Sequence, residues 1–171
     1  FSFVNCGEEN AVAATKSVIC QALYFDSLLA KLKGKQLPSR ELLASGIETA
    51  LKTSINGELV QRVASASKVY FAGRNNGVAE ELALKTNEIT RQQSDFLPGT
   101  FILHGIEEVI TNKDTIVLIE PYESELEKIK QIYEKEIGAN VVAISSYDTP
   151  FETIVIPEVP EVYKGYVSLA A

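Results

Sequence analysis

Two carboxylates and one cation recur at helical spacing in the middle of the chain. Glu81, Lys85 and Glu88 stand at positions i, i+4 and i+7 of the run ELALKTNEI, so a helix would present all three on one face. His104, the only histidine of the chain, follows further along. A carboxylate and an imidazole are suited to moving protons at neutral pH. The residue types therefore indicate proton transfer as one use of this segment.

An ordinary protein surface is the alternative interpretation of the same residues. Glu81 ahead of Lys85 is the favourable orientation of a surface ion pair, which stabilises a helix by ~0.2–0.5 kcal/mol. A lone histidine among apolar residues, as in FILHGI, is more often packed and hydrogen-bonded than catalytic. Spacing alone leaves catalysis and a solvated helix face both open.

Composition excludes several classes of function. The chain has 171 residues, of which 46% are hydrophobic and 23% charged, values typical of a folded protein. The net charge is −7 and the basic residues are scattered, which argues against a nucleic-acid or anionic-membrane surface. A small phosphorylated ligand stays possible, because backbone amides and hydroxyls can hold phosphate without a net positive charge.

The supply of metal ligands is small. Cys6, Cys20 and His104 are the only cysteines and histidine, and they form neither a disulfide framework nor a zinc motif. We therefore predict no metal and no cofactor. No apolar run reaches the ~18 residues of a membrane span, and no secretory signal is visible. Cytoplasmic localisation is the resulting expectation.

The elements that would position these residues alternate between helices and strands. Helical patterns cover residues 11–32, 39–52, 57–66 and 124–137, and a polar linker covers 33–39. Apolar strand-like runs occupy residues 68–73, 115–119, 140–145 and 153–156. This alternation predicts an α/β fold with a doubly wound parallel sheet.

The loop from Gly73 to Gly77 joins the first of these strands to the helix that carries Glu81. A strand, a short glycine-bearing loop and a helix form the unit that places ligands at the carboxyl ends of strands. The loop sequence GRNNG matches neither the dinucleotide fingerprint nor the Walker motif. A structural turn is therefore favoured over a phosphate cradle.

Two separate segments resemble the sugar-isomerase (SIS) family, and most closely its glucosamine-6-phosphate synthase group. The segment NCGEENAVAATK at residues 5–16 is similar to the family's E-x-x-V-A-S-T-K. ELALKTNEI at residues 81–89 is similar to E-G-A-L-K-L-K-E-I, and His104-Gly105 follows at matching distance, with Gly73-Arg74 also in place. The resemblance covers nearly the whole chain in order.

The resemblance implies a flavodoxin-like parallel sheet and a division of the chain into two SIS domains. Residues 1–36 would be the C-terminal part of a first domain. Residues 37–171 would be a second domain lacking its last helix, so the chain is expected to be an internal piece of a longer polypeptide. The family's phosphate-binding loop would lie before Phe1 and its Schiff-base lysine beyond Ala171.

The resemblance also implies roles for individual residues. Glu88 would shuttle a proton between sugar carbons one and two, Lys85 would stabilise developing charge, and His104 would open the sugar ring from the neighbouring subunit of a homodimer with shared active sites. Val12 and Ala14 match positions that bind substrate, although Ala14 replaces a serine.

The implied function is isomerisation of a hexose 6-phosphate or amino-sugar phosphate through an enediol. A fructosamine-phosphate deglycase is one alternative, because it would use the same fold and much the same proton chemistry. A non-catalytic module that senses a sugar phosphate is the other. Thr100–Leu103 and Ile106 differ from the family pattern around the histidine and leave the substrate open.

Overall fold

The computed structural model describes residues 5–171 and divides into two compact units, residues up to Leu42 and residues from Leu43 onward. The predicted division into family domains after residue 36 is a separate matter and stays a prediction.

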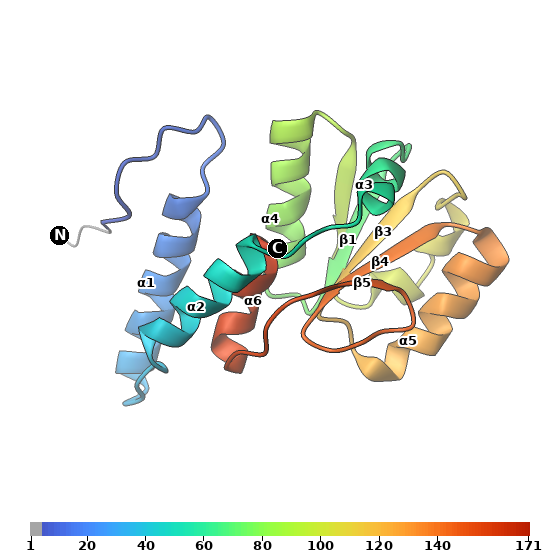
Figure 1. Cartoon of the computed structure of the whole chain (residues 1–171). Helices are drawn as coiled ribbons and strands as arrows, with labels where there is room; N and C mark the ends of the chain where they lie inside the picture. Colours follow the sequence, from blue (N-terminus) through green and yellow to red (C-terminus); the bar gives the residue numbers. More distant parts are fainter. Residues whose placement is uncertain (1–4) are drawn as a thin grey trace. The chain divides into compact units, whose positions relative to one another are not determined.

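The first unit contains helix α1 (Lys16–Leu32), drawn in blue in Figure 1. The prediction that this helix begins at residue 11 is wrong, because a side chain caps it further on. The carboxylate of Glu9 accepts hydrogen bonds from the backbone N–H of Ser17 at 2.8 Å and of Lys16 at 3.3 Å. These bonds satisfy N–H groups that have no partner inside the helix. Ala11–Ala14 therefore precede the helix as non-helical chain.

The second unit is built on a five-stranded, entirely parallel sheet with the strand order β2-β1-β3-β4-β5. The strands are β1 (Val69–Gly73), β2 (Ser94–Leu97), β3 (Thr115–Ile119), β4 (Asn140–Ser145) and β5 (Glu152–Val155). This order is the flavodoxin-like one. The predicted α/β fold with a parallel sheet is confirmed.

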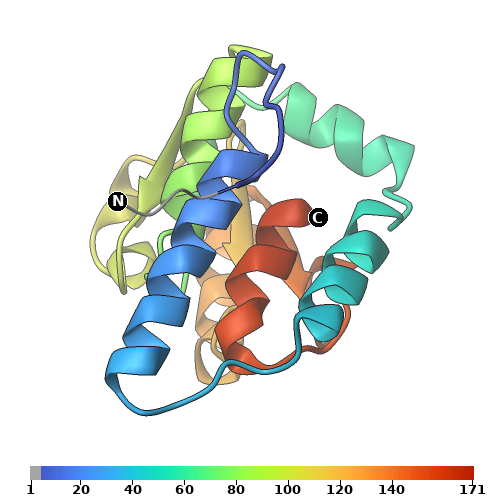
Figure 2. The same cartoon turned by 90° about the vertical axis from the view of Figure 1, so that its left-hand side faces the viewer.

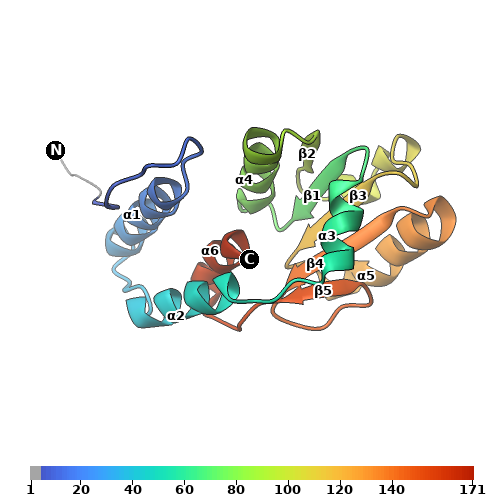
Figure 3. The same cartoon turned by 45° about the horizontal axis from the view of Figure 1, so that its top comes forward.

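Helices cover both faces of this sheet, as Figure 3 shows. On one face α4 (Val78–Lys85) packs on β1 and β2 and against α6 (Glu161–Ala170), and Figure 2 shows these two helices together. On the other face lies α5 (Glu123–Ile129), which continues as the π-helical segment η4 (Lys130–Ile137). Two further helices precede β1, α2 (Arg40–Leu51) and α3 (Gly57–Ala64).

The core between the sheet and α5–η4 follows from strand alternation. Side chains at every second position of β1, β3 and β4 face this helix and the turns after β2. Tyr133 on η4 is fully buried there. The core residues of this face are Tyr70, Ala72, Leu97, Ile102, Ile110, Ile116, Leu118, Leu126, Ile129, Tyr133, Ala139, Val141, Ala143 and Phe151.

Two glycines mark places where packing leaves no room for a side chain. A Cβ at Gly73 would lie 3.1 Å from the carbonyl oxygen of Ile119, so glycine lets the ends of β1 and β3 approach closely. A Cβ at Gly46 on α2 would lie 2.9 Å from Cγ1 of Val159.

Among the helices of residues 5–171, none is both long and apolar enough to cross a bilayer.

Candidate functional site

The structure brings Glu81, Lys85 and Glu88 together on one side of the α4 segment. The Lys85 Nζ lies 3.4 Å from Oε1 of Glu81 and 2.8 Å from Oε2 of Glu88. The Lys85 side chain is only 15% exposed, whereas that of Glu88 is 40% exposed. Lys85 is thus held between two carboxylates, and one of them faces solvent.

The backbone that carries Glu88 is not a regular α-helix. After Lys85 the chain continues as the π-helical segment η1 (Thr86–Thr90), and Arg91 ends it in the left-handed conformation with φ 58°. Short π-helical segments occur often at functional sites. The change of helix type still leaves Glu88 beside Lys85, as the i+3 hydrogen bond between them shows.

The charge state of Lys85 follows from its partners. Its hydrogen bond to Glu88 is the largest influence that raises the pKa of Lys85, and Glu81 adds to it, while burial opposes both. Lys85 therefore stays an ammonium group at neutral pH. A fixed cation beside a solvent-facing carboxylate can stabilise negative charge that develops on a bound molecule.

His104 lies on a different part of the unit. It follows the short helical turn η2 (Phe101–Leu103), and Gly105 after it has φ 90°. His104 is exposed, and within residues 5–171 its imidazole has no hydrogen bond or ion pair. The carbonyl of Ile102 accepts a hydrogen bond from the hydroxyl of the buried Tyr133, which ties the turn before His104 to η4.

Topology separates Glu88 from His104 within one chain. Segment η1 leads into the start of β2, and the turn with His104 follows the end of β2. Four strand residues span roughly 10 Å at about 3.3 Å per residue, so the two side chains belong to opposite ends of this edge strand. The structure therefore does not assemble Glu88 and His104 into one site within a single chain.

The predicted substrate-binding residues lie in the first unit. Val12 is fully exposed and precedes α1, and Ala14 is half-buried just before the helix. Both residues fall within the helical pattern predicted over 11–32, but the helix begins only at Lys16. Their contact with a substrate stays a prediction.

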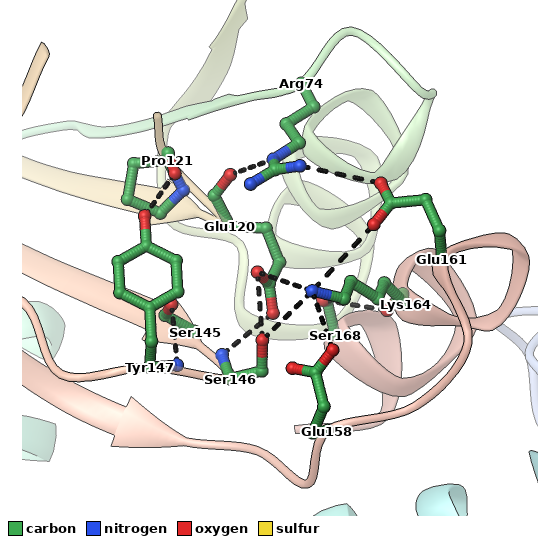
Figure 4. A network of polar contacts seen from close by, with 10 residues as sticks. All are labelled: Arg74, Glu120, Pro121, Ser145, Ser146, Tyr147, Glu158, Glu161, Lys164 and Ser168. Carbon is green, nitrogen blue, oxygen red and sulfur yellow. Dashed lines mark hydrogen bonds and ion pairs between the residues drawn. The ribbon is translucent and has the colours of Figure 1, made fainter. Parts of the chain in front are cut away.

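The carboxyl ends of the strands carry a polar network that the sequence analysis did not find (Figure 4). Glu120, directly after β3, is 3% exposed and has φ 45°, which is uncommon for a residue with a side chain. Its carboxylate accepts a hydrogen bond from the N–H of Ser146 at 2.8 Å and lies 4.0 Å from the Lys164 Nζ. The Arg74 Nε donates to the Glu120 carbonyl at 2.5 Å.

This network fills the place where open α/β sheets usually bind ligands. The chain leaves β1 toward β2 on one side, while β3 lies on the other, so the strand order reverses beside the Gly73–Gly77 loop. Arg74 packs on the ring of Tyr122 and pairs with Glu161 at 3.5 Å. The structural role of the loop stays a prediction. No spacing rule links Glu120, directly after β3, to Lys164 on α6, and only the fold brings them together.

Similarity to known proteins covers nearly the whole chain. No family model matches the chain. A curated relative named glutamine–fructose-6-phosphate aminotransferase (isomerizing), from Oceanobacillus iheyensis, is 26% identical over 182 residues, which cover 97% of this chain and 30% of the relative. The chain thus spans about a third of the length of that relative.

Solved structures share the fold. The C-terminal domain of glucosamine-fructose-6-phosphate aminotransferase from Francisella tularensis matches with a TM-score of 0.74 and 19% identity, over 96% of this chain and 53% of that one. Tagatose-6-phosphate ketose/aldose isomerase from Escherichia coli matches with a TM-score of 0.65 and 17% identity, over 93% of this chain and 50% of that one. At these identities the likeness concerns the fold.

Proposed function

Because the chain combines the sugar-isomerase (SIS) fold with sequence similarity to isomerising aminotransferases, we propose that it contributes acid–base chemistry to a phosphosugar aldose–ketose isomerase or amino-sugar-phosphate enzyme. The observation that carries the proposal is the solvent-facing Glu88 held at 2.8 Å from the ammonium group of Lys85. A solvent-facing carboxylate can act as the general base of enediol chemistry, and a fixed cation beside it can stabilise the negative charge that develops.

In the proposed reaction Glu88 removes the proton from carbon two of an open-chain hexose 6-phosphate. The electron pair forms the double bond between carbons one and two and leaves the negative charge of an enediolate on oxygen one. The conjugate acid of Glu88 then returns the proton to carbon one while the hydroxyl proton of oxygen two moves to oxygen one, which gives the ketose. Lys85 stays protonated and stabilises the negative charge that develops near the carboxylate. Glu81 holds Lys85 from the other side at 3.4 Å. No described residue other than these three takes part in this ion-pair group.

Substitution of Glu88 by glutamine in the full-length protein tests the proposal. The change keeps the size of the side chain and removes the base, so exchange of deuterium from solvent into carbon two of the hexose 6-phosphate should fall ~10²–10⁴-fold. Glu80→Gln is the matched control, because Glu80 is an exposed carboxylate in the first turn of the same helix. Undiminished exchange in Glu88→Gln would refute the role of Glu88. Binding without exchange in the unaltered protein would favour the sensor alternative.

We also propose that His104 acts on a site completed by Glu88 of a second copy of the chain. The opposite placement of the two residues about β2 supports this arrangement. Heterodimers of Glu88→Gln with His104→Ala should regain part of the activity, because one of the two composite sites is then intact. Heterodimers that form but stay inactive would contradict it. The homodimer and a cytoplasmic location stay predictions.

A further inference from the structure

Asn87, the residue before Glu88, connects the π-helical segment to the sheet. Its Oδ1 accepts a hydrogen bond from the N–H of Ser94 at 3.0 Å, and its Nδ2 donates to the carbonyl oxygen of Ser94 at 3.1 Å. The side-chain amide of Asn87 thus forms hydrogen bonds with both the backbone N–H and the carbonyl of Ser94, as the backbone of a neighbouring strand would. Sequence spacing gave no indication of this contact, because Ser94 begins a strand that was not predicted.

Ser94 is itself firmly attached. It pairs with Val69 at the start of β1, and its hydroxyl donates to the carbonyl of Ala83 on α4 at 2.6 Å. Three hydrogen bonds therefore join the α4–η1 segment to the first residue of β2. The bonded residues Ala83 and Asn87 lie on either side of the change from α-helix to π-helix.

The position of Glu88 depends on this attachment. The Glu88 side chain is 40% exposed, so packing does little to fix it, and among residues 5–171 its ion pair is with Lys85. Lys85 restrains the carboxylate from one side, and Asn87 restrains the backbone one residue earlier. We propose that Asn87 is a positioning residue that holds the carboxylate of Glu88 at the carbon acid of the substrate. This inference rests on the proposed function and adds a residue to it.

The expected effect concerns the rate of proton transfer rather than binding. A displacement of about 1 Å in a reacting group can lower the rate ~10²-fold, because the near-attack geometry is lost. Asn87 has no role in holding the sugar phosphate in this proposal. Its loss should therefore lower kcat and leave KM nearly unchanged, which is the pattern expected when only a transition-state interaction is removed.

Asn87→Ala in the full-length protein is the direct test, with Asn140→Ala as the matched control. Asn140 begins β4, and its Nδ2 donates to the hydroxyl of Thr115 at 3.2 Å, so the control also removes one amide from the sheet. Asn87→Ala should lower kcat and carbon-two deuterium exchange by ~10–100-fold, with KM within about twofold. Asn140→Ala should leave both rates unchanged even if its Tm falls as much.

A second variant covers the case in which Asn87→Ala does not fold. Asn87→Asp keeps the acceptor for the N–H of Ser94 and loses the donor to its carbonyl, so its kcat should also fall at unchanged KM. Equal kcat and exchange rates in the unaltered protein and in every folded Asn87 variant would overturn the positioning role. An increase in KM with unchanged kcat would also overturn it. Absence of exchange in the unaltered protein would instead refute the proposed function.

Discussion

The hydroxyl of Tyr133 should contribute measurably to stability, and Tyr133→Phe isolates that contribution. The hydroxyl lies in the core and donates a hydrogen bond to the carbonyl of Ile102, and both residues are buried. Burial raises the pKa of Tyr133, and the nearby carboxylate of Glu107 raises it further. The hydroxyl therefore keeps its proton across the ordinary pH range, and the effect of the substitution should not depend on pH between about 6 and 9.

The magnitude follows from the group that is left behind. Phenylalanine fills nearly the same space but leaves the Ile102 carbonyl buried without a donor, which costs about 1–3 kcal/mol. For a chain of 171 residues, each kcal/mol corresponds to a Tm shift of roughly 2–4 °C. The expected loss in Tm is therefore roughly 2–12 °C.

Urea unfolding and calorimetry of both proteins measure this loss, and Tyr24→Phe is the control. Tyr24 on α1 is partly exposed and keeps its edge contact with Phe25 without the hydroxyl, so its change should stay within about 0.5 kcal/mol. A loss below about 0.5 kcal/mol for Tyr133→Phe would show that the hydrogen bond adds nothing net. Because the bond holds the turn before His104, the proposed exchange at carbon two should also fall in this variant if His104 takes part in the reaction.

Two further predictions concern charged groups. Lys164→Met should lower the free energy of unfolding by about 1–3 kcal/mol, because the buried Glu120 loses the cation 4.0 Å away. This is less than the ~3–5 kcal/mol expected for breaking a fully buried pair, because Lys164 keeps some exposure. Adding Glu120→Gln should recover part of the loss in urea unfolding, and additive effects of the two substitutions would contradict the coupling. Hydrogen bonds from Ser17 lower the pKa of Glu9 to about 2, so its capping of α1 should be complete above about pH 4.5 and lost as the pH falls through about 2. Amide chemical shifts of Ser17 should follow that titration in the natural chain and show no such titration in Glu9→Gln.

Much of the sheet was predictable from sequence, because buried parallel strands are continuous apolar runs. Residues 115–119 and 140–145 correspond to β3 and β4 as the structure has them. Strand β2 was missed. Its residues Ser-Asp-Phe-Leu are half polar, and it is an edge strand that depends on pairing with β1. A short edge strand carries too little apolar pattern to be distinguished from a loop.

The candidate site was predictable only where its residues are close in sequence. The grouping of Glu81, Lys85 and Glu88 followed from helical spacing, which operates over one or two turns. The start of α1 was misplaced because Glu9, outside the helix, caps it through its carboxylate. Contacts such as Asn87 with Ser94 and Glu120 with Lys164 depend on strand placement and on side-chain direction, which no local pattern encodes.

The strand order has a consequence for how the second unit folds. Val69 pairs with Ser94 on one side and with Thr115 on the other, so the central part of the sheet forms only after distant segments of the chain meet. Parallel pairing of this kind slows folding, because the loops must close before the contacts that stabilise the sheet can form. Until β2 and β3 arrive, both edges of the apolar β1 are open to other chains. Refolding yield should therefore decrease as protein concentration rises.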